Sequence, residues 1–264
     1  MTATPKAPKA QSPVIALFVS DVHLQEALPQ TTQAFLRFLQ DQARHAQQLY
    51  LLGDLFEYWA GDDDMATPFH QTIVAALRAV TDAGVGLYWI AGNRDFLIGP
   101  AFAAASGAVL LNDPSVINIA GQKIVLAHGD AQCTDDVAYM AFRSQVRQEK
   151  WQADFLAQPL ALRKQIIYGM RQGSRDAQRM KSQEIMDVHP AAIAALFDAT
   201  STALMIHGHT HRPARHVTRA GETERLRYVL PDWDYDGRDL RGGWIAVDAA
   251  GNLQRMNHDG LALD

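Results

Sequence analysis

The stretch "TALMIHGHTHRP", residues 202–213, places three histidines within five positions, directly after a short apolar run. The apolar run is typical of a buried β-strand, so His207, His209 and His211 lie at a strand end, where α/β folds keep their functional sites. A polar loop with ordinary surface histidines is the alternative. Imidazole is the commonest protein metal ligand, but two or three histidines alone do not complete a metal site. The remaining strand ends must therefore decide between these interpretations.

The composition is that of an ordinary globular protein. The chain has 264 residues, of which 48% are hydrophobic, and a formal net charge of −5. This length allows one large domain or two small ones, with ample apolar residues for a core. The negative charge argues against wholesale nucleic-acid binding, so we expect no nucleic-acid partner. The one cysteine, Cys133, excludes an internal disulfide and fits a reducing cytoplasm.

The beginning of the chain predicts neither a signal peptide nor a membrane anchor. Residues 1–13, "MTATPKAPKAQSP", are rich in Ala, Pro and Lys and are expected to form a disordered tail. The apolar run at 14–19 is too short for a signal sequence, and no later run reaches the roughly 18 apolar residues of a membrane-spanning helix. We expect a cytoplasmic protein whose contact with a membrane, where it occurs, is peripheral.

Apolar periodicity predicts a βαβαβ opening and hence an α/β fold. Strands are expected at 14–20, 49–52 and 85–91, separated by helices at 31–46 and 67–83. Further strands are expected at 109–111, 116–119, 123–128, 203–206, 228–230 and 244–247. Residues 134–200 show an almost purely helical pattern. We therefore expect one domain over 14–264, with a helical insertion at about 134–200 between two strands of the sheet.

Metal-type donors follow five of the predicted strands. Each dipeptide alone, such as "GD" or "GN", is equally typical of a simple turn. Together they supply oxygen and nitrogen ligands suited to Mn²⁺, Fe²⁺ or Zn²⁺, and they exceed what one ion can use, which predicts two ions sharing a carboxylate. The residues concerned are Asp21, His23, Asp54, Asn93, His128, His209 and His211.

This order of motifs, D-X-H, GD, GN, H and GHXH, resembles that of the calcineurin-like metallophosphoesterases over about residues 14–211. The resemblance implies a β-sandwich flanked by helices, with a helical lid insertion. It implies that one metal ion is held by Asp21, His23 and His211. It implies that the second is held by Asn93, His128 and His209, with Asp54 bridging. His207 has no counterpart among the family's ligands and is interpreted as a packing residue.

Longer motifs resemble the UDP-2,3-diacylglucosamine diphosphatases of bacterial lipid A synthesis: "GDLFEYW" (53–59), "GNRDF" (92–96), "HGDAQCTDD" (128–136), "KSQEIMDV" (181–188) and "HGHTHRP" (207–213). This resemblance implies hydrolysis of the nucleotide–lipid pyrophosphate to UMP and an acylated glucosamine 1-phosphate (lipid X). It implies two Mn²⁺ per chain and a peripheral position on the inner face of the bacterial inner membrane. As the starting hypothesis we take a monomer.

The same resemblance implies a set of catalytic and substrate-binding residues. Asn93, Arg94 and His209 are implied in both roles, although Arg94 could instead be a solvated loop arginine. The positions implied to contact the substrate's sugar and phosphate are Asp136, Ser174, Gln178 and Lys181. The stretch "VLPDWDYDG" (229–237) departs from the family's shorter turn, so the loop at 231–242 has no predicted role.

The helical insertion carries a local positive charge within an acidic protein. Residues 143–182 contain nine basic and three acidic residues, interleaved with bulky apolar ones. A solvated helix face is the ordinary explanation of such a run. The interleaving favours an amphipathic pair of helices with a basic rim and an apolar interior, suited to an acylated, phosphate-bearing substrate.

Two other functions were compared with this one. A generic nucleotide or cyclic-nucleotide phosphodiesterase of the same superfamily would not need a basic, apolar insertion. A non-catalytic scaffold on the same fold would be expected to lose metal ligands, whereas this chain keeps all seven. Cys133 is treated as a packing residue, because a soft thiolate suits the expected metals poorly.

Overall fold

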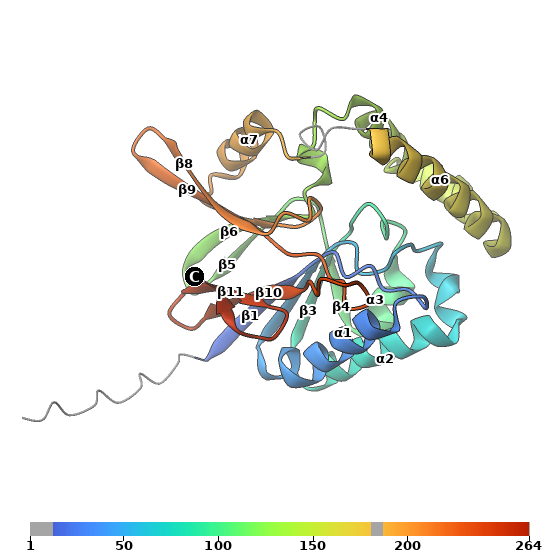
Figure 1. The fold of residues 1–264 in the computed structure, drawn as a ribbon, viewed down its shortest axis with the longest axis horizontal. Coiled ribbons are helices and arrows are strands. Elements are labelled where there is room, and N and C mark those ends of the chain that lie inside the picture. The colour runs from blue at the N-terminus through green and yellow to red at the C-terminus, as the bar shows by residue number, and fades with distance from the viewer. Residues whose placement is uncertain (1–12, 181–186, 264) are drawn as a thin grey trace, which may run out of the picture.

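The computed structural model describes residues 13–180 and 187–263, with the backbone alone for 173–180. Its strands form two sheets (Figure 1). The larger sheet has the order β12-β11-β10-β1-β2-β3-β4 and the smaller the order β5-β6-β7-β9-β8. The larger contains β1 (Val14–Val19), β2 (Gln48–Leu52), β3 (Gly86–Ile90), β4 (Ala108–Leu111), β10 (Gly243–Asp248), β11 (Leu253–Asn257) and β12 (Ala262–Leu263). The smaller contains β5 (Ser115–Ile119), β6 (Gln122–Ala127), β7 (Leu204–His207), β8 (Ala214–Ala220) and β9 (Thr223–Val229).

The two sheets pack face to face over a shared apolar core. Phe18 and Tyr50 of the larger sheet belong to one buried cluster with Leu126 and Ile206 of the smaller sheet. The rings of Phe18 and Tyr50 stack with their centroids 4.9 Å apart. Strands β1 to β4 run parallel, as the predicted βαβαβ opening requires. Residues of alternate parity on these strands therefore point either into the sandwich or out toward the helices.

Helices cover both outer faces of the sandwich. The larger sheet is covered by α1 (Pro29–Asp41), α2 (Pro68–Asp82) and α3 (Pro100–Ser106), which share a second buried cluster with it. The smaller sheet is covered by α7 (Pro190–Thr200), which shares a third cluster with β6 and β7. Each of these four helices begins at a proline, the residue whose fixed φ and missing N–H suit the first turn. The predicted β-sandwich flanked by helices is confirmed.

Three further helices lie between β6 and β7 in the chain. They are α4 (Val137–Val146), α5 (Glu149–Leu156) and α6 (Leu160–Met180), which together we call the lid helices. They stand at one end of the sandwich, with α6 extending to the edge of the molecule (Figure 1). Trp151, Phe155, Ile166 and Ile167 of α5 and α6 pack against the main core cluster. The lid helices are therefore continuous with the hydrophobic core.

Three features of the fold differ from the prediction. The helix expected at 31–46 ends at Asp41, and a 3₁₀ turn, η1 (Ala43–His45), follows it. Two more 3₁₀ turns, η2 (Asp62–Ala66) and η3 (Asp130–Gln132), lie in loops. The short helix α3 and the strands β8, β11 and β12 were not predicted. Strand β8 is exposed at nearly every position, so its sequence lacks the apolar alternation that reveals a half-buried strand.

Within the described ranges, every helix is too short or too polar to cross a membrane.

Truncating the ring at the centre of the sandwich should show how much of the stability resides there. Phe18 is fully buried, so we expect Phe18→Ala to lower the free energy of unfolding by about 3–5 kcal/mol through lost burial and the cavity left behind. Urea denaturation gives this value. Val109→Ala is the control, because Val109 is 52% exposed on an edge strand and should change stability by only about 0.5 kcal/mol. Similar losses in both variants would contradict the proposed core.

Candidate metal centre

The loops after β1 and β2 are joined by backbone hydrogen bonds, and this brings the first two motifs together. The backbone N–H of Asp21 donates to the carbonyl of Gly53 (3.1 Å), and that of His23 donates to the carbonyl of Asp54 (3.0 Å). Strands β6 and β7 of the other sheet are also parallel, so His128 and the "GHTH" stretch follow at one common edge. The loops from both sheets therefore meet at the same end of the sandwich.

The first group of donors consists of Asp21, His23 and His211. The Nε2 atoms of the two histidines are 3.2 Å apart. The Oδ1 atom of Asp21 lies 3.4 Å from His211 Nε2 and 4.0 Å from His23 Nε2. Three nitrogen and oxygen atoms thus converge on one point, as a single divalent cation requires.

The second group consists of Asp21, Asp54 and His128, with Asn93 beside it. His128 Nε2 lies 3.7 Å from Asp54 Oδ1 and 3.0 Å from Asn93 Oδ1. The other oxygen of Asp54, Oδ2, lies 4.0 Å from His23 Nε2. Asp54 therefore faces both groups, one oxygen to each, and Asp21 is a member of both.

His209 completes the cluster. Its backbone N–H donates to Asp21 Oδ2 (2.9 Å), and its ring lies 5.0 Å from the ring of His128 between centroids. On its other side, the ring of Tyr139 from α4 stacks on it at 6.1 Å. All seven residues that the sequence pattern singled out as ligands are thus brought to one end of the sandwich.

Five of these residues have a left-handed backbone. Within the described ranges, seven non-glycine residues have positive φ, and five of them are Asp21 (53°), His23 (53°), Asp54 (54°), His209 (68°) and His211 (54°). This conformation is uncommon for residues other than glycine and costs of order 1–3 kcal/mol each. Strain concentrated on one cluster is typical of a functional site. The left-handed backbone turns these side chains in directions that a regular strand would not allow.

The electrostatics of the cluster suit positive charge. Asp21 is fully buried, and its Oδ1 has no hydrogen-bond partner in the described part of the chain. Burial opposes ionisation of this carboxyl, but the His211 contact and the neighbouring imidazoles hold its pKa well below the usual range. Burial likewise opposes protonation of His128, yet the carboxylates of Asp54, Asp130 and Asp21 raise its pKa to about 9. A site that favours a cation this strongly fits divalent metal ions.

Neighbouring groups turn the Nε2 atom of two histidines toward the cluster. His128 Nδ1 lies 2.9 Å from the carbonyl oxygen of Leu52, to which it donates. His23 Nδ1 lies 2.9 Å from a carboxylate oxygen of Glu57. A hydrogen held at Nδ1 makes Nε2 the nitrogen that is deprotonated in the neutral ring and would then bind a metal.

One cleft joins this cluster to the lid helices. It has a volume of about 650 Å³. Its polar end is formed by cluster residues and by Arg94, whose Nε finds no hydrogen-bond partner within residues 13–180 and 187–263. Its apolar end is formed by side chains of the sandwich and of the lid helices, among them Phe96, Leu97, Phe142, Trp151, Phe155, Ile167 and Met170.

Comparison with known proteins agrees with this geometry. The calcineurin-like phosphoesterase family model matches residues 16–213. A UDP-2,3-diacylglucosamine hydrolase of Aromatoleum aromaticum is 48% identical over 86% of this chain and 92% of its own length. Enzymes of that name from Klebsiella pneumoniae (48% identity, 84% of this chain, 92% of the relative) and Pseudomonas putida (46%, 89%, 95%) are similar too. The chain belongs to the UDP-2,3-diacylglucosamine hydrolase family of calcineurin-like phosphoesterases.

The remaining histidine of the triplet, His207, is used differently from its neighbours. It is fully buried, with Nδ1 2.9 Å from the carbonyl oxygen of Gly208 and Nε2 3.0 Å from Arg227. Burial and the Arg227 guanidinium lower its pKa to about 3, so it is neutral at neutral pH. Cys133 is also buried, and burial raises the pKa of its thiol to about 12. His207 does not line the cleft, whereas Cys133 belongs to the buried cluster under α7 and also borders the cleft.

The positive charge of the insertion is largely used to hold the lid helices on the sandwich. Arg143 pairs with Asp130 (2.8 Å), and Lys164 pairs with Asp64 (2.5 Å). In the described part of the chain, most of the basic side chains expected to form a rim instead pair with carboxylates of the sandwich and hold the lid helices against it. The other described basic side chains of this stretch also have partners: Arg147 contacts Asp130 and the Gly92 carbonyl, Lys150 pairs with Asp154, Arg163 with Asp63 and Arg171 with Glu57.

The four predicted lid contacts fall into two groups. Asp136 lines the cleft and also caps α4, because its Oδ1 accepts from the backbone N–H of Tyr139 (3.0 Å). This second role satisfies an orphan donor at the helix N-terminus. Ser174 and Gln178 lie on the backbone of α6, but their side chains are outside the described residues, as is the whole of Lys181.

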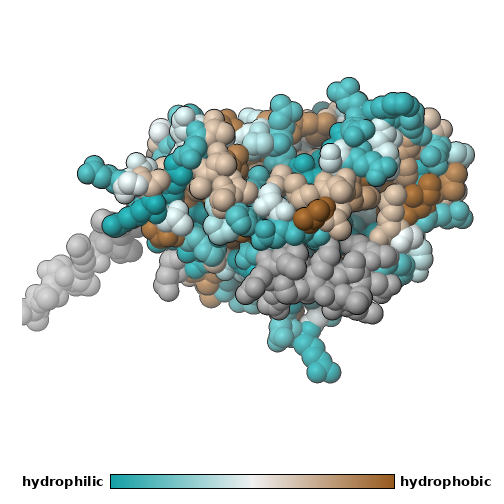
Figure 2. Space-filling model, turned by 90° about the horizontal axis from the view of Figure 1, so that it is seen from above, coloured by the Kyte–Doolittle hydropathy of each residue, from teal (hydrophilic) through white to brown (hydrophobic). Residues whose placement is uncertain are grey.

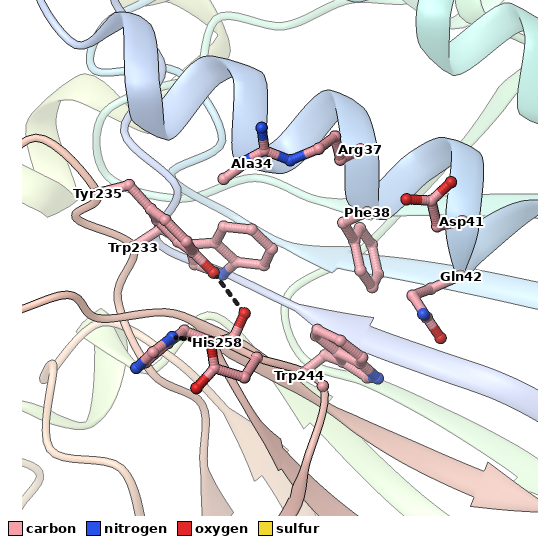
Figure 3. Close-up of a pocket in the computed structure, with 11 residues that line it drawn as sticks. Ala34, Arg37, Phe38, Asp41, Gln42, Trp233, Tyr235, Trp244 and His258 are labelled. Carbon is pink, nitrogen blue, oxygen red and sulfur yellow. Dashed lines mark hydrogen bonds and ion pairs between the residues drawn. The ribbon is translucent and has the colours of Figure 1, made fainter.

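The loop at 231–242, which had no predicted role, holds the backbone of the cluster residue Asp21. The backbone N–H of Trp233 donates to the carbonyl of Asp21 (3.0 Å). Its indole lies between α1 and β10, where Phe38 (5.7 Å between ring centroids), Trp244 and Tyr235 surround a small hollow of about 240 Å³ (Figure 3). This aromatic packing holds the loop, and the loop holds the backbone of Asp21.

Sequence reasoning missed three supporting carboxylates, although each lies inside a quoted motif. Asp95 of "GNRDF" is fully buried and accepts from the backbone N–H groups of Leu55 (2.8 Å) and Gly92 (2.9 Å), tying two loops together. Asp130 follows His128 by two residues, and Glu57 follows Asp54 by three. Proximity to a ligand in the sequence was the only signal for them.

Replacing His207 should separate its packing role from metal binding. His207→Ala leaves Arg227 and the Gly208 carbonyl without this partner, so we expect a loss of about 1–3 kcal/mol in unfolding free energy. Metal content, measured by plasma mass spectrometry, should stay at the wild-type level, whereas His209→Ala and His211→Ala should lower it. Equal metal loss in all three variants would show that His207 is itself a ligand.

Proposed function

We propose that this protein hydrolyses the pyrophosphate of UDP-2,3-diacylglucosamine to UMP and 2,3-diacylglucosamine 1-phosphate, in lipid A biosynthesis. The observation that carries the proposal is the single cleft that joins a metal-type cluster to an apolar chamber under the lid helices. The names of the relatives support the same substrate. A substrate with a pyrophosphate at one end and acyl chains at the other matches both ends of this cleft.

The proposed metal content is two Mn²⁺ per chain. Asp21, His23 and His211 would hold one ion, and Asn93, His128 and His209 would hold the other. Asp54 lies between the two groups and would bridge. When bound, such a pair of ions activates water at neutral pH and neutralises charge on the attacking and leaving oxygens.

The protein's own residues orient the phosphate and accept its charge. The backbone N–H of Arg94 donates to Asp54 Oδ1 (2.8 Å), and Arg94 lines the same cleft as Asp54. We assign its guanidinium to the nonbridging oxygens of the phosphate nearer the uridine. In the reaction, an oxygen of water forms a bond to that phosphorus while the bond to the bridging oxygen breaks. Asn93 and His209 border the same space.

The leaving group is a phosphate monoester and needs little help to depart. A leaving group of low basicity requires no strong general acid. His209 lines the cleft, and burial lowers its pKa to about 4, so its imidazole is neutral at neutral pH. A neutral imidazole can both bind a metal and contact the phosphoryl group.

The lid helices are proposed to select the acylated sugar. Phe142, Phe155, Ile167 and Met170 present apolar surface to the cleft. Each buried methylene of an acyl chain contributes about 0.8 kcal/mol, so a few methylenes outweigh one polar contact. We place the sugar and its phosphate near Asp136, Ser174, Gln178 and Lys181. This assignment treats residues 14–264 as one domain whose insertion at about 134–200 contains the lid helices.

Peripheral attachment to the inner face of the bacterial inner membrane fits the outer surface of the lid helices. Apolar patches lie among hydrophilic side chains at the α6 end of the molecule (Figure 2). A monomer is sufficient for this arrangement, because one chain supplies both ends of the cleft. Among the described side chains of the lid helices, the exposed apolar residues that do not line the cleft are Val137, Leu156, Leu162 and Tyr168.

Product analysis tests the reaction itself. Purified protein with Mn²⁺ is incubated with UDP-2,3-diacylglucosamine, and the products are identified by mass spectrometry. We expect UMP and the diacylated sugar 1-phosphate in equal amounts. Hydrolysis of small nucleotide phosphodiesters at a higher rate than the lipid substrate would instead favour a nucleotide phosphodiesterase.

Asp54 should be needed for both metal ions. Asp54→Ala removes the carboxylate that faces both groups, so we expect metal occupancy to fall and turnover to drop by at least about 100-fold. Circular dichroism should show a preserved fold. Two tightly retained ions and near-normal turnover in this variant would exclude the bridging assignment.

Charge placed inside the apolar end of the cleft should impair substrate selection more than chemistry. We expect Ile167→Asp to cut activity on the lipid substrate by at least about 100-fold, since it puts a carboxylate where acyl chains bind. Hydrolysis of a small chromogenic phosphodiester should change less than about threefold. Gln165→Asp is the matched control, because it adds the same charge on an exposed position of α6. A parallel loss of both activities, with the fold and metals intact, would place the lid within the catalytic machinery.

A further inference from the structure

Glu57 is a largely buried carboxylate that the reaction outlined above does not use. One of its oxygens, Oε2, lies 2.9 Å from His23 Nδ1, and its side chain is only 14% exposed. Its backbone is held as well, because its N–H donates to the carbonyl of Leu24 (3.1 Å). Leu24 and Phe56 also form a parallel bridge. These backbone contacts therefore hold the segment that carries Glu57 against the segment that follows His23.

The other oxygen of Glu57 connects to the lid helices. Arg171, on α6, forms an ion pair with Oε1 and also donates to the backbone carbonyl of Glu57 (2.9 Å). The guanidinium is 13% exposed, so solvent screens this pair much less than a surface ion pair. A chain of contacts thus runs from α6 through Arg171 and Glu57 to His23.

The contact restricts how His23 can present its two nitrogens. A neutral imidazole carries one N–H, and an ionised carboxylate can only accept, so the hydrogen is held at Nδ1. The lone pair of Nε2 then points to the side where His211 Nε2 lies 3.2 Å away and where the oxygens of Asp21 and Asp54 each lie 4.0 Å away. Ring orientation and tautomer are set by the same contact.

We propose that Glu57 is a positioning residue that holds His23 in its metal-binding tautomer, and that Arg171 makes this hold depend on docking of the lid helices. Lid and metal site are then energetically coupled. Docking of α6 strengthens metal binding at the Asp21, His23 and His211 group, and metal binding there strengthens docking by the same factor. The inference rests on the proposed function in taking His23 as a metal ligand.

His211, the second histidine of that group, has a longer contact to a carboxylate than His23 has. His211 Nδ1 lies 3.7 Å from Asp232 Oδ2, which is too far for a hydrogen bond. Arg241 pairs with the same oxygen at 2.9 Å. Asp232 thus has the same kind of arginine partner as Glu57 without the close contact to imidazole. We expect Asp232→Asn to weaken metal binding less than Glu57→Gln.

Calorimetric titration of the full-length, metal-stripped protein with Mn²⁺ tests the coupling without any substrate. Loss of a carboxylate behind a metal ligand lowers affinity about 10–100-fold, and we expect this for Glu57→Ala, with a smaller loss for Glu57→Gln and Arg171→Ala. Asp63→Ala is the matched control. It removes the partner of Arg163 on the same lid helix but contacts no ligand, so its Mn²⁺ affinity should stay within about twofold of wild type.

Nitrogen NMR of the histidine rings, recorded on the same metal-stripped proteins, tests the tautomer directly. We expect His23 to carry its hydrogen on Nδ1 in the wild type and in Asp63→Ala. In Glu57→Ala it should shift toward the Nε2–H form that free histidine prefers. Glu57→Gln keeps an acceptor and should lie between, and it also serves if the alanine variant fails to fold.

The outcomes separate this inference from the proposed function. Wild-type protein that binds Mn²⁺ but variants of Glu57 that bind it equally well would overturn the inference and leave the function standing. Equal loss of affinity in Asp63→Ala and Glu57→Ala would also overturn it, since a loosened lid would then suffice. Absence of Mn²⁺ binding by the wild type would refute the metal-dependent function. Weakened binding with a shifted tautomer supports the inference whatever the lipid assay shows.

Discussion

Two carboxylates, Asp21 and Asp54, lie almost fully buried beside each other at the ends of two parallel strands. Two buried carboxylates that lie close together repel each other and are poorly solvated. They stay ionised only where positive charge and hydrogen-bond donors surround them. Three features meet this constraint: four imidazoles come from three loops, backbone N–H groups donate to the carboxylates, and the pKa of His128 rises to about 9. Two divalent cations would complete the compensation.

Packing of the sandwich offsets the backbone strain of this arrangement. Five cluster residues hold a left-handed backbone, a conformation that persists only when the surroundings over-determine it. The rigid part lies immediately upstream, where Phe18 stacks on Tyr50 between the sheets, and behind the site, where Trp233 packs against Phe38 and ties its backbone to Asp21. The metal-type donors thus lie at the strand ends, and the apolar packing of the two sheets and of the Trp233 loop stabilises their backbone.

The apolar surface of the cleft lies in a different part of the molecule from the metal-type donors. The lid helices add apolar surface to the cleft and use their described basic side chains to pair with carboxylates, most of them on the sandwich. Charge in this insertion therefore helps to determine where the lid sits. The contact between Arg171 and Glu57 is the point at which lid position and metal site meet.

The sequence alone indicated most of the strands and the seven ligand-type residues, because each is recorded locally as apolar periodicity or as a polar motif at a strand end. The sandwich with its covering helices was implied by the family resemblance of those motifs. It did not reveal β8, whose positions are nearly all exposed, or the role of the loop that carries Trp233. Only the tertiary structure decided that Glu57 faces His23 and Arg171, residues 34 and 114 positions away, and that the lid arginines with described side chains pair with groups of the sandwich. The physical reason is that the sequence does not distinguish a charged side chain that faces water from one that pairs with another residue. The packing of segments distant in the chain determines which residue becomes its partner.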